Sequence, residues 1–334
     1  MALLATPMID LDLSSKGGIK MAELIRVENL KKHFKTKYGL LYAVDGVNFS
    51  IEKGKTLGLV GESGCGKSTT GRLIMRLIEA TEGKIIFKGQ DITKLKAQEM
   101  QELRRVIQMI FQDPFGSLNP RKSVYELINE PLRWHNVCKN KAEEREKIEN
   151  LMETVGLAQR FINSYPHELD GGRRQRIGVA RALALDPKLI VCDEPVSALD
   201  VSIQAQILNF LEDLQQERGL TFLFITHDLS VVNHLSDDVA VMYLGKLVEK
   251  APVKEIFNNP LHPYTQALFS AIPSIDVDNK RERILLKGEI SSPINPPNEC
   301  RFANRCNYVQ DICRQKEPEL REVSPGHFLS CTVK

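Results

Sequence analysis

Residues 61–69 read Gly61-Glu62-Ser63-Gly64-Cys65-Gly66-Lys67-Ser68-Thr69, and this stretch fits G-x-x-x-x-G-K-[ST], the pattern of a phosphate-binding loop. The apolar residues 56–60 before it are typical of a short buried strand, and residues 70–76 after it favour a helix. A glycine-rich turn that matches by coincidence is the alternative. A strand before and a helix after are, however, the context that such a loop requires. The stretch therefore predicts a nucleotide site in an α/β fold.

Each part of this loop has a chemical role. The glycines let the backbone curl until successive N–H groups point at phosphate oxygens, and the helix that follows adds unpaired N–H groups and a favourable dipole. Lys67 is expected to pair with the β- and γ-phosphates, and the Ser68 hydroxyl to bind Mg²⁺. The predicted nucleotide-binding residues of the loop are Gly61, Ser63, Gly64, Cys65, Gly66, Lys67, Ser68 and Thr69.

A second group of polar residues follows two apolar stretches. Residues 189–192 lead into Asp193 and Glu194, and residues 221–225 lead toward His227, as expected at the ends of buried parallel strands. Neighbouring residues of a strand point to opposite sides, so the two carboxylates receive different roles. We expect Asp193 to bind Mg²⁺ and Glu194 to polarise an attacking water, with His227 near the γ-phosphate. A lone histidine is more often structural, but this one accompanies two motifs.

A pair of glycines precedes the helix that we predict over residues 174–185. Leu169-Asp170-Gly171-Gly172-Arg173 leads into it, and Gly171 and Gly172 make a second helix N-terminus suited to an anion. An ordinary helix start, with Asp170 as the N-cap, is the alternative, and for this motif taken alone it is the stronger one.

Together these segments resemble the ATP-binding subunits of ABC transporters, and the order and spacing of the motifs match over residues 24–250. The matched motifs are Walker A (61–69), the Q-loop glutamine (Gln112), the signature motif (169–173), Walker B (189–194), the D-loop (Ser197-Ala198-Leu199-Asp200) and the switch histidine (His227). The resemblance implies a RecA-like P-loop α/β core with an antiparallel β edge and a helical subdomain at about residues 113–180. It also implies ATP hydrolysis with Glu194, His227 and Gln112 as catalytic residues.

The same resemblance adds further contacts. Gln112 would also bind Mg²⁺, and Phe34 would stack on adenine, with Tyr38 and Tyr42 as rival candidates. The glycines of the signature motif would face the nucleotide of a second chain, which implies a head-to-tail dimer that clamps ATP. The family usually has serine followed by Gly-Gly-Gln, whereas this chain has Asp170 and Arg173 around its glycines. A carboxylate repels a γ-phosphate, so Asp170 is expected to cap the helix instead.

Two further segments narrow the resemblance to the peptide/nickel importer subfamily. Residues 111–121 resemble its Q-loop region, and residues 259–265 resemble the segment that leads into its cysteine-rich tail. The similarity to a dipeptide/oligopeptide importer ATPase covers nearly all of residues 22–334. It implies two membrane permease subunits, a second identical or paralogous ATPase chain, an indirect link to a solute-binding protein, and a peripheral location at the cytoplasmic face of the cell membrane. Nickel or another small solute is the alternative cargo.

The composition and apolar patterning of the sequence suggest three regions. Residues 1–21 are expected to be a flexible extension or an expression remnant, because Met21 opens a cleaner start. Residues 22–258 form the predicted nucleotide-binding domain, and residues 259–334 a small C-terminal domain, since Pro, Asn and Cys become frequent there. The expected strands are 24–27, 47–51, 84–87, 106–111, 189–192 and 221–225, and the expected helices are 123–133, 142–155, 174–185 and 203–216.

Composition limits the remaining functions. The chain has 334 residues, 42% of them hydrophobic and 26% charged, with a net charge of only +2, so no nucleic-acid partner is expected. No apolar run is long enough to span a bilayer. A soluble ABC ATPase of repair or translation is a rival, but the chain has a single cassette and no heptad run. A regulatory module that does not hydrolyse ATP is a second rival, against which Glu194 and His227 argue.

Four of the seven cysteines lie near the C-terminus, as Cys300, Cys306, Cys313 and Cys331. The surrounding segment has too few apolar residues for a large core, so a metal centre would help to hold it together. Disulfides are disfavoured in a reducing compartment, and zinc usually takes pairs with closer spacing. The resemblance implies this cysteine pattern, with a [4Fe–4S] cluster in some members. We expect such a cluster, with zinc or an empty site as alternatives.

Overall fold

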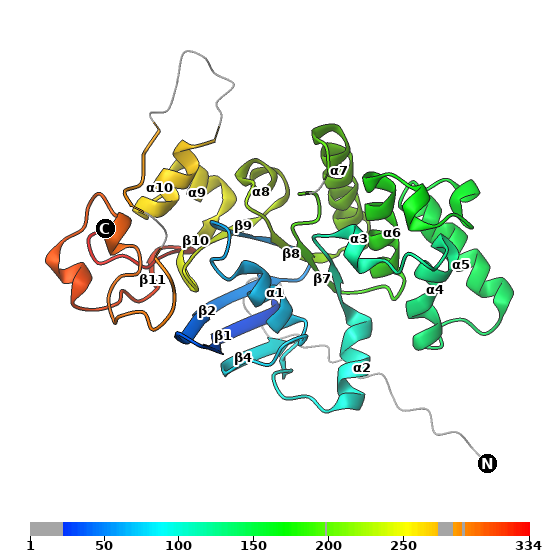
Figure 1. Cartoon of the computed structure of the whole chain (residues 1–334), viewed down its shortest axis with the longest axis horizontal. Helices are drawn as coiled ribbons and strands as arrows, with labels where there is room; N and C mark the ends of the chain where they lie inside the picture. The colour runs from blue at the N-terminus through cyan, green and yellow to red at the C-terminus, as the bar shows by residue number, and fades with distance from the viewer. Residues whose placement is uncertain (1–22, 198, 273–282, 289–290) are drawn as a thin grey trace, which may run out of the picture.

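A computed structural model of the chain describes residues 23–197, 199–272, 283–288 and 291–334. The predicted N-terminal extension lies outside these residues. Figure 1 shows a centre of β-strands with helices at one end of the molecule and the C-terminal residues at the other. The loop of residues 61–69 lies in the central part, where β3 joins α1.

The main sheet of the described residues has eight strands. In spatial order they are β11 (Arg321–Ser324), β12 (His327–Leu329), β10 (Lys246–Pro252), β9 (Asp238–Tyr243), β3 (Thr56–Val60), β8 (Thr221–Ile225), β7 (Leu189–Asp193) and β6 (Ile107–Ile110). The strands from β9 to β6 are parallel, and every residue of β3, β7 and β8 is buried, as expected for strands covered on both faces. The strands predicted at 106–111, 189–192 and 221–225 are confirmed.

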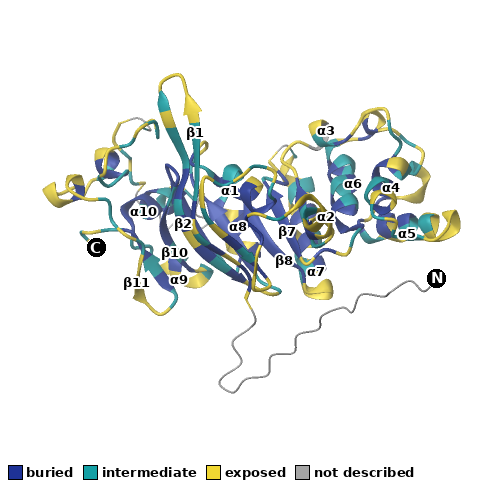
Figure 2. Ribbon diagram, turned by 90° about the horizontal axis from the view of Figure 1, so that it is seen from below, coloured by how far each residue is buried: buried dark blue, intermediate teal, exposed yellow. Residues whose placement is uncertain are grey.

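A second, antiparallel sheet forms the predicted β edge. Its strands, in spatial order, are β2 (Gly39–Glu52), β1 (Glu23–Thr36), β4 (Glu82–Phe87) and β5 (Gln90–Asp91). Apolar residues of this sheet, among them Val27, Val44 and Ile85, share a buried cluster with Leu59 of β3 and Leu73 of α1. Figure 2 shows buried residues along the strands of both sheets, so the loop between β3 and α1 is built on a rigid support.

The helices predicted at 123–133, 142–155, 174–185 and 203–216 are confirmed, with ends that differ by one to three residues. They are α1 (Lys67–Ile74), α2 (Ala97–Val106), α3 (Pro114–Ser117), α4 (Val124–Trp134), α5 (Lys141–Thr154), α6 (Gly171–Leu183), α7 (Val201–Arg218), α8 (Leu229–Leu235), α9 (Val253–Asn258) and α10 (Pro263–Ser270). Ser123 caps α4 as predicted and forms a capping box with Glu126. Helices α3 to α6 lie together at one end in Figure 1. The apolar faces of α4, α5 and α6 share one buried cluster with β7 and β8, which joins this helical region to the main sheet.

Residues 259–334, which we call the C-terminal segment, are continuous with the main sheet. Strand β12 pairs with β10, with Glu249 opposite Leu329, and β11 continues the sheet from β12. Helix α9 ends at Asn258, close to the predicted boundary. Short 3-10 turns, η3 (Ala303–Arg305) and η4 (Asp311–Arg314), make up part of the segment, and η1 (Gln159–Phe161) and η2 (Pro166–Glu168) lie before α6. Among the described residues, the longest helices are too short or too polar to cross a bilayer.

Candidate functional site

The loop of residues 61–69 is held tightly against its surroundings. A Cβ on Gly61 would collide with the carbonyl oxygen of Met242, and one on Gly66 with that of Ala43, and both glycines have positive φ. Lys67, which is 4% exposed, donates from Nζ to the carbonyl oxygens of Gly61 at 2.8 Å and Glu62 at 3.0 Å. The ammonium group of Lys67 therefore lies inside the curl of the loop, beside the position that the sequence predicts for phosphates.

A cavity of about 560 Å³ opens above the loop. It is lined by Phe34, Leu41, Ala43, Ser63, Gly64, Gly66, Lys67, Ser68, Thr69, Gln112, Glu194, His227 and Pro293. Of the three aromatic candidates for adenine, Phe34 lines this cavity. Tyr38 is 71% exposed, and the Tyr42 ring packs on His33 with 4.0 Å between centroids. The Cys65 side chain is buried beneath the loop, where burial raises the pKa of its thiol. Cys65 and Gly61 therefore contribute backbone to the loop.

Ser68, which lines this cavity, meets Asp193 at the end of β7. The Ser68 hydroxyl donates to Asp193 Oδ1 at 2.7 Å, although the two residues are 125 positions apart. Burial raises the pKa of Asp193 above its usual range, in spite of the hydrogen bond from Ser68. A hydroxyl and a carboxylate oxygen suit Mg²⁺, which takes few protein ligands and completes its shell with water and substrate phosphates. The residues present therefore fit the predicted ion.

Glu194 is the meeting point of the three predicted catalytic residues. Gln112 Nε2 donates to Glu194 Oε2 at 2.8 Å, and Nδ1 of His227 lies 3.4 Å from Glu194 Oε1. Glu194 itself has a φ of 46°, an unusual value for a non-glycine residue, and its N–H donates to the carbonyl oxygen of Ile225 in β8. The backbone thus turns sharply after Asp193, so the two adjacent carboxylates serve different neighbours.

The signature-motif residues lie apart from this cavity, at the start of α6. Asp170 accepts a hydrogen bond from the Arg173 N–H at 2.8 Å, so it is the N-cap of α6, as predicted. The Arg173 guanidinium returns to the Asp170 carboxylate at 2.9 Å and lies over the Phe161 ring. Gly171 and Gly172 are the first two residues of the helix. Both charges that depart from the family pattern are therefore engaged with each other.

The four C-terminal cysteines converge, as free thiols, on a small cavity of about 20 Å³. Burial raises the pKa of Cys300 to about 11 and also raises the pKa of Cys306, while the N–H of Tyr308 donates to the Cys306 sulfur at 3.3 Å. Within the described part of the chain, no three His, Cys, Asp or Glu side chains form a group that is ready to hold a metal ion. The donor set suits a metal, but the thiols would have to draw together around it.

Three residues that line the cavity above the loop were not predicted from the sequence. Leu41 and Ala43 belong to β2, and Pro293 comes from the C-terminal segment. The N–H of Tyr42 donates to the carbonyl oxygen of Pro293 at 2.9 Å, which holds the two chain segments side by side. These residues carry no polar group and fit no motif, so the sequence has no signal that marks their positions.

Comparison with known proteins places this geometry in a family. The model of the ABC transporter family matches residues 44–197, and that of the oligopeptide/dipeptide transporter C-terminal region matches residues 248–313. The oligopeptide transport ATP-binding protein AppF of Bacillus subtilis is 54% identical over 318 residues, covering 92% of this chain and 96% of AppF. OppF of the same organism is 51% identical over 311 residues, covering 93% of this chain and 96% of OppF.

Solved structures agree with this assignment. A dimeric post-hydrolysis structure of the ATP-binding cassette MJ0796, bound to ADP and Pi, covers 69% of this chain with a TM-score of 0.64 and 29% identity, and 99% of that cassette is matched. The cassette cbiO1 of Clostridium perfringens covers 71% of this chain and 92% of its own length, with a TM-score of 0.63 and 28% identity. The chain therefore belongs to the ABC transporter family and, within it, to the ATP-hydrolysing subunits of the oligopeptide/dipeptide transporter group.

Proposed function

We propose that this ATPase drives the import of dipeptides or oligopeptides through partner permeases. The observation that carries the proposal is the convergence of Gln112, Glu194 and His227 on one cavity with the phosphate-binding loop. The curated relatives that match nearly the whole chain are described as oligopeptide transport proteins, and this supports peptides as the cargo. Nickel or another small solute is the alternative.

ATP would bind with its phosphates in the loop and its adenine against Phe34. Lys67 would pair with the β- and γ-phosphates, and the loop N–H groups would cradle the same oxygens. Ser68 and Asp193, with Gln112, would hold Mg²⁺, which neutralises charge on the phosphates when bound. Gly171 and Gly172 of a second chain would close the site from the other side.

Glu194 would act on the water that attacks the γ-phosphate. Its carboxylate lies at the rim of the cavity, with one oxygen toward Gln112 and the other toward His227. Gln112 donates to one carboxylate oxygen and would help to orient Glu194 toward that water. His227 is 60% exposed and would hold the Glu194 carboxylate in place from the other side.

The Glu194→Gln variant tests this assignment, because it keeps the shape of the side chain and removes its basicity. It should bind ATP with unchanged affinity and lose about 100-fold or more in turnover, since a water-positioning base is lost. Peptide uptake should stop in vesicles that hold the variant with its permeases. Turnover of the variant close to that of the unsubstituted protein would contradict the role of Glu194. Uptake of nickel instead of peptides by the unsubstituted protein with its permeases would contradict the proposed cargo.

We infer a head-to-tail pair of ATPase chains, identical or paralogous, with one ATP clamped at each contact. The dimeric structure of the cassette MJ0796 supports this arrangement. Each site would combine the loop of one chain with the start of α6 from the other. The free energy of ATP binding would therefore favour the closed dimer. A Glu194→Gln chain that remains monomeric with ATP at every concentration would require a paralogous partner in place of a second copy.

The permeases would dock in the groove between the main sheet and the helical region. This groove has a volume of about 720 Å³, and its lining includes Leu77, Phe111 and Trp134, of which Trp134 is 73% exposed. Gln112 and Asp193 also line it, so movement of a docked permease would reach the ATP site directly. Docking places the chain at the cytoplasmic face of the cell membrane, and a solute-binding protein would act through the permeases.

We also propose that residues 259–334 form a cysteine-rich domain, following the nucleotide-binding domain of residues 22–258 with its helical subdomain at about 113–180. Its four thiols around one cavity suit a [4Fe–4S] cluster, with zinc as the alternative. Protein purified without oxygen should be brown, absorb near ~400 nm and contain about four irons per chain. Colourless protein with one zinc per chain would select the alternative, and metal-free protein would contradict both.

A further inference from the structure

Two buried arginines run from one short stretch of the C-terminal segment into the nucleotide-binding core. Arg301 and Arg305 both lie between Cys300 and Cys306, and their side chains are only 7% and 9% exposed. Arg301 pairs with Asp45 of β2, and Arg305 pairs with Glu62 of the phosphate-binding loop. The acidic partners are partly buried, with 11% of the Asp45 side chain and 25% of the Glu62 side chain exposed, so the two pairs tie this stretch to the core.

Arg305 holds the second residue of the loop. Its Nη1 lies 2.6 Å from Glu62 Oε2, and its Nη2 lies 3.0 Å from Glu62 Oε1, which makes the pair bidentate. The Glu62 N–H donates to the hydroxyl of Tyr264 at 2.9 Å, and the Glu62 carbonyl oxygen accepts from Lys67. Glu62 is therefore fixed at its side chain and at both of its backbone polar groups, and two of these three contacts come from the C-terminal segment.

The pair also sets the charge next to the phosphates. An unpaired Glu62 carboxylate in a loop that binds phosphate would repel ATP, because like charges destabilise each other at close range. The Arg305 guanidinium compensates this charge and also lies over the Tyr243 ring, 5.8 Å from its centroid. Tyr243 packs in turn on Tyr264 and Phe302, with ring centroids 4.7 Å and 5.2 Å away. This aromatic cluster keeps Arg305 in its position.

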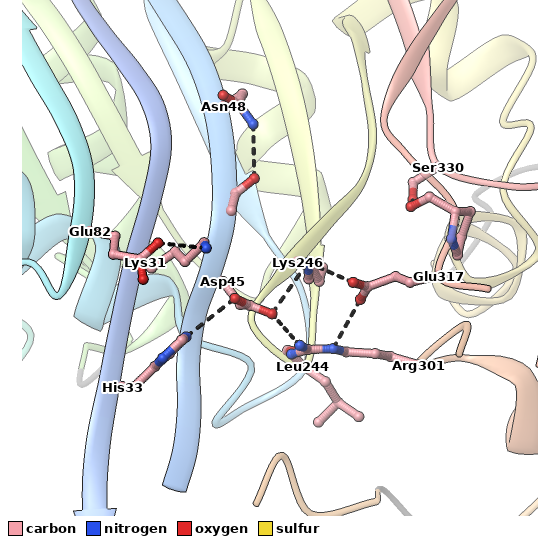
Figure 3. Close-up of polar contacts among 12 residues, drawn as sticks. Lys31, His33, Asp45, Asn48, Glu82, Leu244, Lys246, Arg301, Glu317 and Ser330 are labelled. Carbon is pink, nitrogen blue, oxygen red and sulfur yellow. Dashed lines mark hydrogen bonds and ion pairs between the residues drawn. The ribbon is translucent and has the colours of Figure 1, made fainter. Parts of the chain in front are cut away.

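The second ion pair, between Arg301 and Asp45, lies on the side of the cavity where adenine is predicted to bind. Figure 3 shows Asp45 between His33, Lys246 and Arg301, while Arg301 and Lys246 also reach Glu317. Burial alone would raise the pKa of Asp45, but the charges of Lys246 and Arg301 hold it below its usual range. His33 precedes Phe34 in β1, so the network fixes the strand that carries the predicted adenine contact.

A third set of contacts joins the C-terminal segment to β2 beside the cavity. Leu41 and Ile294 form an isolated antiparallel bridge, and the Asn295 Oδ1 accepts from the N–H of Leu40 at 3.0 Å. Pro293, in the same stretch, lines the nucleotide cavity itself. The C-terminal segment thus touches the predicted ATP site at the loop, at the strands of the β edge and at the cavity wall.

We propose that the C-terminal segment is a working part of the ATP site, with Arg305 as a positioning residue that fixes the phosphate-binding loop through Glu62. The inference rests on the placement of ATP in this loop. It predicts that Arg305 governs the affinity for ATP, whereas the chemical step, which belongs to Glu194, changes little.

The test compares Arg305→Ala with Arg305→Lys and with Arg314→Ala, in the full chain. Arg314 lies in the same segment, is half exposed and serves as the matched control. Binding of a fluorescent ATP analogue and steady-state ATP hydrolysis would be measured for each. Arg305→Ala should raise Kd and KM for ATP about tenfold with kcat changed less than about threefold, since a bidentate charged pair is lost. Arg305→Lys should be intermediate, and Arg314→Ala unchanged.

A double-mutant cycle shows whether the effect passes through Glu62. In a Glu62→Ala background, Arg305→Ala should change Kd by less than about twofold, because the pair is already absent. Folded Arg305→Ala protein with the Kd and KM of the unchanged chain would overturn the proposal. If Arg305→Ala does not fold, Arg305→Lys and Glu62→Ala provide the test. Kd values for ATP that are unchanged in both variants would overturn the proposal. If ATP does not bind in this loop at all, Lys67→Ala would leave the affinity for ATP unaltered. That result distinguishes failure of the proposed function from failure of the role of Arg305.

Discussion

His262, in the C-terminal segment, offers a direct test of how burial sets stability. The ring is 2% exposed, and its Nδ1 accepts the N–H of Tyr264 at 3.1 Å, which caps α10. The buried Glu249 carboxylate lies nearby, but it accepts from the backbone N–H groups of Leu261 and His262 and contacts the ring of His327. Burial lowers the pKa of His262 from 6.5 to about 3, because a charged ring would lose its hydration there.

The sign of the effect follows from this lowered pKa. Between pH 6.5 and about 3 the unfolded chain binds a proton at His262 that the folded chain does not bind, so the free energy of unfolding falls as pH falls. Each pH unit in this window costs about 1.4 kcal/mol. Between pH 7.5 and pH 5 the loss from this group alone is therefore about 2 kcal/mol.

The assay compares urea unfolding of the unchanged chain and of His262→Asn at pH 7.5 and pH 5. Asparagine can accept the same N–H as a cap but does not titrate. The stability advantage of the unchanged chain over His262→Asn should shrink by about 2 kcal/mol at pH 5. His234→Asn, at a half-exposed histidine on α8, is measured in the same way as the control. An equal advantage of the unchanged chain at both pH values would refute the reasoning.

Three further predictions concern the site. Lys67→Ala should weaken the binding of a fluorescent ATP analogue by about 10-fold or more, because the buried ammonium group is lost from the loop, and unchanged affinity would contradict the loop assignment. Asp170→Ser, made in the Glu194→Gln background, should increase ATP-driven dimerisation seen by size-exclusion chromatography, because serine still caps α6 and can donate to a phosphate. Trp134→Ala should reduce co-purification with the permeases but leave basal ATPase activity intact, and full recovery would argue against the docking groove.

Much of the fold was predictable because its signals are local. The buried strands β7 and β8 are continuous apolar runs, and the loop between β3 and α1 has its own pattern, so each could be recognised within ten residues. The meeting of Gln112 with Glu194, 82 positions away, depended on the family resemblance. Strands β1 and β2 are much longer than predicted. Register shifts along their pairing, and the positive φ of Asn29, interrupt the alternation that would have revealed them.

The contacts between the C-terminal segment and the ATP site were beyond sequence reasoning. Arg305 and Glu62 are 243 positions apart, and each alone looks like an ordinary charged surface residue. Their pairing depends on how the segment folds back along β10 and the β edge. Asp45, which contacts Lys246, Arg301 and His33 in the fold, has no such neighbour beside it in the sequence. Burial of a charged side chain is a tertiary property, and only the fold shows it.

The two departures in the signature motif have to be considered together. A lone carboxylate at Asp170 would cap α6 and also repel a phosphate, but the Arg173 guanidinium at 2.9 Å compensates its charge. The start of α6 therefore lacks a hydroxyl donor without gaining strong repulsion. In a pair of identical chains, both composite sites would lack that donor. A paralogue with serine at this position would restore it at one site, and that site is the one built from the loop and Glu194 of this chain. Pairing with such a paralogue would therefore join the proposed hydrolytic residues of this chain to a signature that has its serine.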